Sequence, residues 1–283
     1  QQHNCSQLPY PYPMATWDIG APVAAFSWKS ASPRAQLLLM HGLGEYSERY
    51  LTYCSELIPK LNQQGIDVYA FDLPGHGRTA GERGLVDVNQ GVALHLQARS
   101  RLPAGLPTVL FGHSLGGLIT GASIVRERGN ITGAIIDASA MQTPSKRWER
   151  ILASVSTRFA PGAPMPLPRP GIEALSRDKA FLAEVEKDEL FYQGKAKNLV
   201  AKTVLEVSDQ VWAATGNWKA PTLIIHGNKD TSTSHLNSMG LHQAIASPDK
   251  ELKIYPGGHH ELLNDLCKSE VEEDIFEWLL ARV

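Results

Sequence analysis

The feature that most constrains this chain is a serine enclosed by glycines between a strand-like run and a helix-like run. The segment Gly112-His113-Ser114-Leu115-Gly116 has the spacing G-x-S-x-G. It follows the β-prone run 108–111 and precedes the apolar run 118–125, which is typical of a helix. A chain that turns sharply from a strand into a helix at a serine exposes the hydroxyl, and the flanking glycines relieve crowding in the turn. The pattern therefore predicts Ser114 as a nucleophile.

A nucleophilic serine needs a base, and the base needs an acid that orients it. On an elbow of this kind the chain order is serine, acid, histidine. The strand predicted over 221–226 breaks at Gly227 and presents Asp230 just beyond its end, so Asp230 is the predicted acid. Asp137 ends the strand predicted over 133–137, and it is an alternative because some proteins with such a sheet place the acid there.

The base is expected on the loop that follows the last strand. The alternating strand 251–255 runs into Pro256-Gly257-Gly258-His259-His260-Glu261. His259 and His260 are adjacent, so only one of them is able to face the serine. At this level the residues leave both histidines open as the general base.

Acyl transfer at a serine also needs two backbone N–H donors that hold the developing oxyanion. One is expected from the residue after the nucleophile, Leu115. The other is expected from the loop His41-Gly42-Leu43-Gly44, which follows the strand predicted over 35–40, and Leu43 is the predicted donor. His41 is expected to hold this loop by hydrogen bonds rather than to act as a base.

The order of the predicted elements indicates a mostly parallel sheet, because strands and helices alternate along the chain. A pair of short strands is expected within 16–28. The elements after it are strand 37–41, helix 51–62, strand 67–72, helix 92–101, strand 108–111 and strand 133–137.

The alternation stops between 138 and 215, where no convincing core strand is found. The run 159–170 is dense in proline, and 172–187 and 197–212 carry apolar residues at helical spacing. We therefore predict a helical cap at 138–215 that overhangs the serine, inserted into a core of 1–137 and 216–283. Seven apolar residues of the cap are candidates to line an acyl channel: Met141, Trp148, Ile151, Leu152, Met165, Leu167 and Leu205.

Composition and charge agree with one enlarged globular domain. The 283 residues are 43% hydrophobic and 20% charged, and the formal net charge is -2 without a long basic run. Nucleic-acid binding is therefore not indicated. No apolar run approaches the roughly 20 residues that a membrane-spanning helix needs.

The cysteines and the N-terminus leave the compartment open. Cys5, Cys54 and Cys267 are widely spaced, show no zinc-binding pattern and allow one disulfide at most. The segment 1–13 is polar and rich in proline, and is expected to lie over the surface. Since the sequence starts at Gln1, both a cytoplasmic location and secretion after N-terminal processing remain open.

Five segments together resemble monoacylglycerol lipases of the α/β-hydrolase superfamily. The segment 41–50 resembles their H-G-x-G-E-x-S-x-R-Y, and 72–81 is similar to their D-x-x-G-H-G-x-S-x-G, with Thr79 where serine is usual. The segment 112–117 matches G-H-S-x-G-G, and 175–178 resembles a short motif of their cap. The segment 255–261 resembles the Y-x-G-x-x-H-E around their catalytic histidine, and this alignment selects His260.

The resemblance implies an α/β-hydrolase fold and the catalytic set Ser114, Asp230 and His260. It also implies cleavage of a single fatty-acyl ester from glycerol, with no cofactor and no metal. The expected partners are a small lipid ester and, transiently, a membrane or micelle surface that the cap touches. The oligomeric state stays open.

Three alternatives remain. A lysophospholipase or a broad carboxylesterase would use the same mechanism. Dehalogenases, epoxide hydrolases and cofactor-free peroxidases share the fold. The first two use an aspartate nucleophile, and Ser114 argues against them. A hydrolase-like binding protein would be expected to have lost one of the catalytic residues, and all three are present here.

Overall fold

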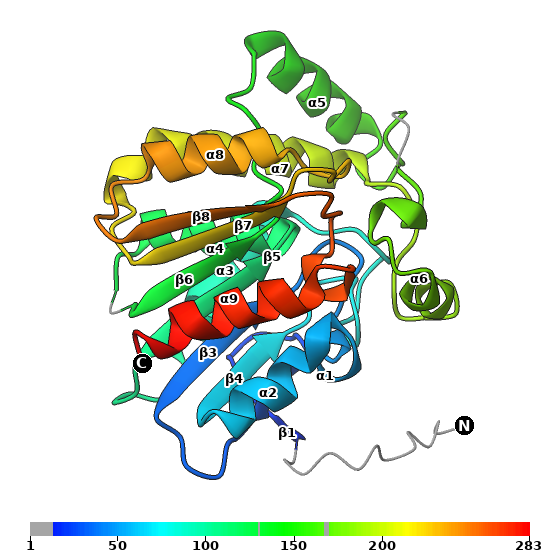
Figure 1. The fold of residues 1–283 in the computed structure, drawn as a ribbon. Coiled ribbons are helices and arrows are strands. Elements are labelled where there is room, and N and C mark those ends of the chain that lie inside the picture. The colour runs from blue at the N-terminus through cyan, green and yellow to red at the C-terminus, as the bar shows by residue number, and fades with distance from the viewer. Residues whose placement is uncertain (1–13, 130, 167–169) are drawn as a thin grey trace.

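The fold is centred on a mostly parallel β-sheet, seen in a computed structural model that describes residues 14–129, 131–166 and 170–283. Within these residues the sheet has eight strands in the order β1-β2-β4-β3-β5-β6-β7-β8 (Figure 1). Only the pairings β1–β2 and β2–β4 are antiparallel. The mostly parallel sheet predicted from the sequence is confirmed. The strands are β1 Met14–Thr16, β2 Ala25–Trp28, β3 Ala35–Met40, β4 Ile66–Phe71, β5 Thr108–His113, β6 Gly133–Asp137, β7 Thr222–Gly227 and β8 Lys250–Tyr255.

Helices cover both faces of the sheet, which is why the central strands are nearly continuous apolar runs. One face packs against α3, α4, α7 and α8, and the other packs against α1, α2 and α9. The helices are α1 Arg49–Thr52, α2 Leu57–Gln63, α3 Val88–Ser100, α4 Leu115–Arg126, α5 Arg147–Phe159, α6 Lys179–Val185, α7 Asn198–Ala213, α8 His235–Ala244 and α9 Lys268–Leu280. Short 3-10 turns lie at η1 Cys54–Glu56, η2 Ile172–Ala174, η3 Thr215–Asn217 and η4 Leu262–Asn264.

The single helix predicted over 51–62 is broken into α1 and α2. Cys54, Ser55 and Glu56 have φ angles of 52°, 56° and 53°, the left-handed region that disfavours side chains. Contacts with η4 hold them there: the Cys54 amide donates to Asn264 Oδ1 at 2.5 Å, and Ser55 Oγ donates to the Leu263 carbonyl at 3.0 Å. Tertiary hydrogen bonds therefore override the helical pattern at this point.

The insertion between β6 and β7 has two parts that differ in packing. α5 stands clear of the sheet and α6 lies beyond its edge, as Figure 1 shows. α7 instead packs against α3 and α4, with Val200, Val207 and Val211 buried in the same core layer. Thus the last helix of the segment predicted as cap, 138–215, contributes to the core. The domain division itself stays a prediction.

Within the described residues, no helix combines the length and the apolar character that crossing a membrane requires.

Candidate active site

The turn at Ser114 has the geometry that the G-x-S-x-G spacing predicts. β5 runs directly into α4, and Ser114 between them has φ 52° and ψ −117°, a strained conformation for a residue with a side chain. The Ser114 amide donates to the Asp137 carbonyl at 2.9 Å, which ties the turn to β6. A Cβ on Gly116 would collide with the carbonyl oxygens of Met40 and His41, so glycine is required for this close approach.

Ser114, His260 and Asp230 form one hydrogen-bonded chain. Ser114 Oγ lies 2.9 Å from His260 Nε2, and His260 Nδ1 lies 2.7 Å from Asp230 Oδ2. His259 is turned away, because its amide donates to Asp265 and its ring lies near the Glu173 carbonyl. The structure therefore brings together the three residues of the predicted set, which follow the strands β5, β7 and β8.

The alternative acid, Asp137, has a different partner. Its Oδ2 lies 3.0 Å from His113 Nδ1, one residue before the serine. Burial lowers the pKa of His113, but the charges of Glu45 and Asp137 outweigh that effect and raise it to about 10. His113 is therefore an imidazolium at neutral pH, and its ring centroid lies 4.9 Å from that of His260. Asp137 balances this buried charge.

The side chain of Asp230 is fully buried, and its carboxylate accepts several hydrogen bonds. Oδ1 accepts hydrogen bonds from the amides of Ser232 and Thr233 at 2.7 and 3.0 Å. Oδ2 contacts His260 and also His226 Nε2, at 3.0 Å. Burial raises the pKa of Asp230, but the charge of His260 and these donors outweigh that effect and hold the pKa well below its usual range. Sequence reasoning missed His226, although a histidine four residues before the acid at the end of β7 was a usable signal.

The loop expected to carry an oxyanion donor lies against the serine. A Cβ built on Gly42 would be 3.1 Å from Ser114 Cβ. Leu43 follows in the same turn, and Leu115 opens α4, so the Leu115 amide has no acceptor one helical turn earlier. His41 holds the loop, because its Nδ1 lies 2.8 Å from the Gly42 carbonyl and its Nε2 accepts from the Leu73 amide at 3.1 Å. Leu43 and Leu115 stay the predicted donors.

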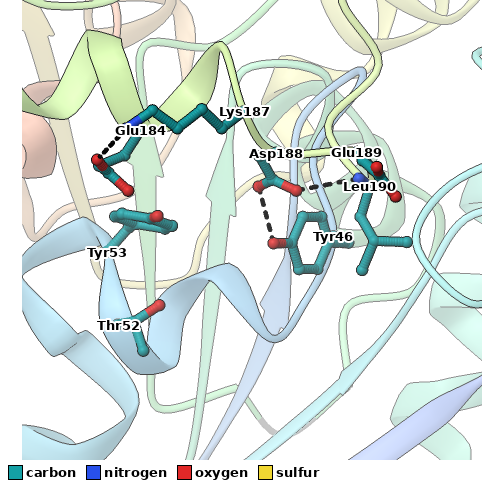
Figure 2. A pocket seen from close by; sticks show the side chains of 8 residues that line it. All are labelled: Tyr46, Thr52, Tyr53, Glu184, Lys187, Asp188, Glu189 and Leu190. Carbon is teal, nitrogen blue, oxygen red and sulfur yellow. Dashed lines mark hydrogen bonds and ion pairs between the residues drawn. The ribbon is translucent and has the colours of Figure 1, made fainter. Parts of the chain in front are cut away.

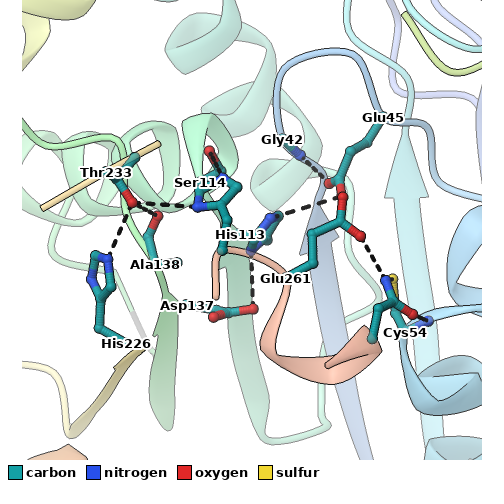
Figure 3. A network of polar contacts seen from close by, with 12 residues as sticks. Gly42, Glu45, Cys54, His113, Ser114, Asp137, Ala138, His226, Thr233 and Glu261 are labelled. Atoms are coloured by element: carbon teal, nitrogen blue, oxygen red, sulfur yellow. Dashed lines mark hydrogen bonds and ion pairs between the residues drawn. The ribbon is translucent and has the colours of Figure 1, made fainter. Parts of the chain in front are cut away.

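One buried guanidinium links this loop to the loop of His260. Glu45 Oε2 accepts from the Gly42 amide at 2.6 Å, and Glu45 Oε1 accepts from Arg49 Nη1 at 2.6 Å. Arg49 also makes a bidentate pair with Glu261, at 3.2 and 3.1 Å (Figure 3 shows Glu45 and Glu261 converging). Burial raises the pKa of Glu45, but the charges of His113 and Arg49 outweigh that effect and lower it to about 2. Arg49 therefore pairs with both carboxylates, those of Glu45 and Glu261.

The insertion also braces the histidine loop. The amides of His260 and Glu261 donate to the Ala174 and Leu175 carbonyls at 3.3 and 2.8 Å. Arg177 pairs with the buried Asp265 through Nε and Nη2 at about 3 Å. The segment predicted as a cap motif, 175–178, therefore binds the loop of the base, which also explains why the helix predicted over 172–187 splits into η2 and α6.

The apolar candidates for an acyl channel differ in how far they are exposed. Met141 is buried in the core, and Met165 and Leu205 are half-buried. Trp148, Ile151 and Leu152 lie exposed on α5, with Trp148 60% exposed. Their helical spacing indicated one apolar face, and that face is exposed, so the acyl channel stays a prediction. Leu167 lies outside the described residues.

A polar hollow of about 450 Å³ lies where the insertion meets α1 (Figure 2). Tyr46 on its wall donates to Asp188 Oδ2 at 2.8 Å, which joins the loop after β3 to the chain beyond α6. Ser114 does not line the hollow. Its residues are Tyr46, Thr52, Tyr53, Glu184, Lys187, Asp188, Glu189 and Leu190.

The thiols and potential metal ligands add no further site. Cys54 and Cys267 are free thiols, and Cys5 lies outside the described residues. In the part of the chain that the structure describes, no group of three or more His, Cys, Asp or Glu side chains is placed to hold a metal ion.

A mostly parallel sheet, with a serine, a histidine and an aspartate joined at the carboxyl ends of its strands, defines an α/β-hydrolase. The family model described as Hydrolase_4, serine aminopeptidase S33, matches residues 31–267, so the chain belongs to that family. The α/β-hydrolase fold implied by the sequence resemblance is confirmed.

Relatives that match about nine tenths of this chain support its assignment to the family. A monoacylglycerol lipase of Mycolicibacterium smegmatis is 29% identical over 89% of this chain and 90% of its own length. The human monoglyceride lipase is 28% identical over 90% of this chain and 86% of its own length. The crystal structure of Paleococcus ferrophilus monoacylglycerol lipase has a TM-score of 0.79 and 29% identity, and the match covers 92% of this chain and 99% of that one.

Replacing Arg49 tests the energetic role of the buried cation. Arg49→Met keeps much of the volume but leaves Glu261 buried without its charge partner and Glu45 with His113 alone, so we expect a loss of roughly 3–5 kcal/mol in the free energy of unfolding. The control is Arg78→Met, because Arg78 pairs with Glu48 at the surface, where a pair contributes about 0–1 kcal/mol. Urea unfolding measures both variants, and equal losses would contradict the assignment.

Proposed function

We propose that the protein is a serine hydrolase that cleaves monoacylglycerols into a fatty acid and glycerol through an acyl-enzyme. The observation that carries the proposal is the unbroken hydrogen-bond chain from Ser114 Oγ through His260 to Asp230, at 2.9 and 2.7 Å. Support for the substrate comes from the relatives named monoacylglycerol or monoglyceride lipase, which match over 84% or more of their own length.

In the proposed mechanism, Ser114 Oγ attacks the ester carbonyl while His260 Nε2 takes its proton. Asp230 keeps the Nδ1–H of His260 directed at its carboxylate and stabilises the imidazolium that forms. The amides of Leu43 and Leu115 hold the oxyanion of the tetrahedral intermediate. Collapse of the intermediate releases glycerol, which receives the proton from His260, and water then repeats the sequence on the acyl-enzyme.

The strained backbone at Ser114 has a role in this mechanism. The left-handed φ lifts the hydroxyl above the turn and points it at His260, where a relaxed helical residue would direct it into the preceding turn. His113 directly beneath is a fixed cation, and its charge is balanced by Asp137 and Glu45 rather than exposed to the reacting ester. We therefore assign Asp137 a supporting role and Asp230 the role of the acid.

The catalytic set is tested with matched pairs of variants. Ser114→Ala and His260→Ala should each lower kcat by about 10³-fold or more, because nucleophile and base act as a unit. His259→Ala should stay near the parent. Asp230→Asn should lower turnover strongly, whereas Asp137→Asn should mainly lower the melting temperature through the His113 pair. Turnover of p-nitrophenyl butyrate and labelling by a fluorophosphonate measure these effects, and a reversed ranking of the two histidines would refute the assignment.

The substrate is tested with glycerides of one, two and three oleoyl chains. A site that accepts a single acyl chain gains about 0.8 kcal/mol per buried CH₂ and has no place for further chains. We expect kcat/KM to fall at least tenfold from mono- to dioleoylglycerol and further for trioleoylglycerol. Equal efficiency on all three would favour a general lipase, and a preference for lysophosphatidylcholine would favour a lysophospholipase. Alanine p-nitroanilide controls for the peptidase activity in the family description.

We further propose that α5 contacts the lipid surface from which the substrate is drawn. Trp148, Ile151, Leu152, Val155 and Phe159 lie at helical spacing, and all are more than half exposed. Arg147 and Arg158 lie on the same helix and suit anionic headgroups.

Removing the apolar face of α5 tests this contact. Trp148→Ser combined with Phe159→Ser should reduce flotation with phosphatidylglycerol vesicles about tenfold and lower turnover of vesicle-bound monooleoylglycerol. Turnover of soluble p-nitrophenyl butyrate should not change, because Ser114 is untouched. Leu266→Ser is the matched control, since Leu266 is 65% exposed on the segment between η4 and α9. Undiminished flotation of the double variant would exclude α5 as the contact.

A further inference from the structure

A second histidine is bonded to the same oxygen of Asp230 that orients His260. His226 lies near the end of β7 and is fully buried. Its Nε2 is 3.0 Å from Asp230 Oδ2, and His260 Nδ1 is 2.7 Å from that oxygen. On its other side, His226 Nδ1 lies 2.7 Å from Ser238 Oγ, a buried hydroxyl on α8.

The hydrogen-bond partners dictate what His226 does. An ionised carboxylate only accepts hydrogen bonds, so His226 Nε2 carries a proton and donates it toward Oδ2. Ser238 Oγ lies within hydrogen-bond distance of Nδ1 on the opposite side of the ring and holds its orientation. The result is a mirror arrangement, Ser114–His260–Asp230–His226–Ser238. Only Ser114 is placed to meet a substrate, because Ser238 is 2% exposed.

We propose that His226 is a positioning residue that acts through Asp230. Its N–H fixes the carboxylate in the plane that meets His260, and it shares the negative charge of Oδ2. The shared charge limits how strongly Asp230 stabilises the protonated form of His260. This inference rests on the proposed catalytic role of Ser114, His260 and Asp230.

The other groups that contact Asp230 do not take over the role of His226 at Oδ2. Thr233 Oγ1 lies 2.8 Å from Oδ2, but it also lies 3.1 Å from the Ala138 carbonyl, and its single proton serves only one of them (Figure 3 shows Thr233 between His226 and Ala138). The two amides of residues 232 and 233 bond Oδ1 instead. His226 is therefore the imidazole donor that competes with His260 for Oδ2.

Other titratable groups face this pair and are kept unchanged in the test. His235 on α8 faces His226, with ring centroids 6.4 Å apart. His113 on β5 faces His260, and its charge is balanced by Glu45 and Asp137. Glu261 and His259 are the sequence neighbours of His260. Because none of them is altered, a shift in the pH profile of a His226 variant reports on the bond to Asp230.

The experiment compares His226→Leu, which removes the donor, with His226→Gln, whose amide is able to donate to Oδ2. The pH dependence of kcat/KM is measured on p-nitrophenyl butyrate, with active sites counted by a fluorophosphonate. For His226→Leu we expect kcat about tenfold lower, KM within about twofold, and the midpoint of the acid limb about half a pH unit higher. His226→Gln should restore the parent midpoint and most of kcat. His242→Leu, at the far end of α8, is the matched control.

A structural role alone would lower the count of active sites or the melting temperature without moving the midpoint, and that result would overturn the proposal. If His226→Leu does not fold, Ser238→Ala takes its place: it removes the partner of Nδ1 and should move the midpoint in the same direction by a smaller amount, and an unmoved midpoint would count against the proposal. The proposed function fails separately, if the parent does not hydrolyse the ester or if Ser114→Ala retains its activity.

Discussion

The active site depends on one buried cation, the guanidinium of Arg49. Glu45 holds the Gly42 amide and so shapes the loop expected to hold the oxyanion, while Glu261 is the residue after His260. Because both carboxylates pair with Arg49, the loop after β3 and the loop after β8 are held at a fixed separation across the sheet. An arginine suits this position, since its planar fork binds two carboxylates at once and lysine offers only a point charge.

Aromatic rings of the insertion between β6 and β7 also lie against the Arg49 guanidinium. The rings of Phe181 on α6 and Phe191 beyond it lie 5.7 and 4.6 Å from the Arg49 guanidinium carbon. An aromatic face attracts a cation most strongly where water is excluded, and these rings exclude it. Through Phe191 and through the Arg177–Asp265 pair, the insertion therefore stabilises the two loops on which the proposed chemistry depends.

The sequence was informative where function follows from local backbone geometry. Short segments predict the elbow at Ser114, the order of Asp230 and His260, and the parallel sheet. The spacing within each segment fits one local structure. The sequence was uninformative where long-range contacts decide. The left-handed turn at Cys54–Glu56 exists because of Asn264 and Leu263, which lie more than 200 residues away. The contact between His226 and Asp230 likewise depends on how β7 and the loop after it fold.

The apolar helix of the insertion shows the limit of periodicity most directly. The spacing of Trp148, Ile151 and Leu152 defines a face but carries no information about what that face meets. A face over the serine and a face toward solvent give the same sequence pattern, and the difference lies in whether other parts of the chain cover it. In this fold Arg150 pairs with Asp209 on α7 and anchors the polar side of α5 toward the core. The apolar side chains Trp148, Ile151 and Leu152 stay exposed, so within the described residues nothing covers the face that their spacing defines.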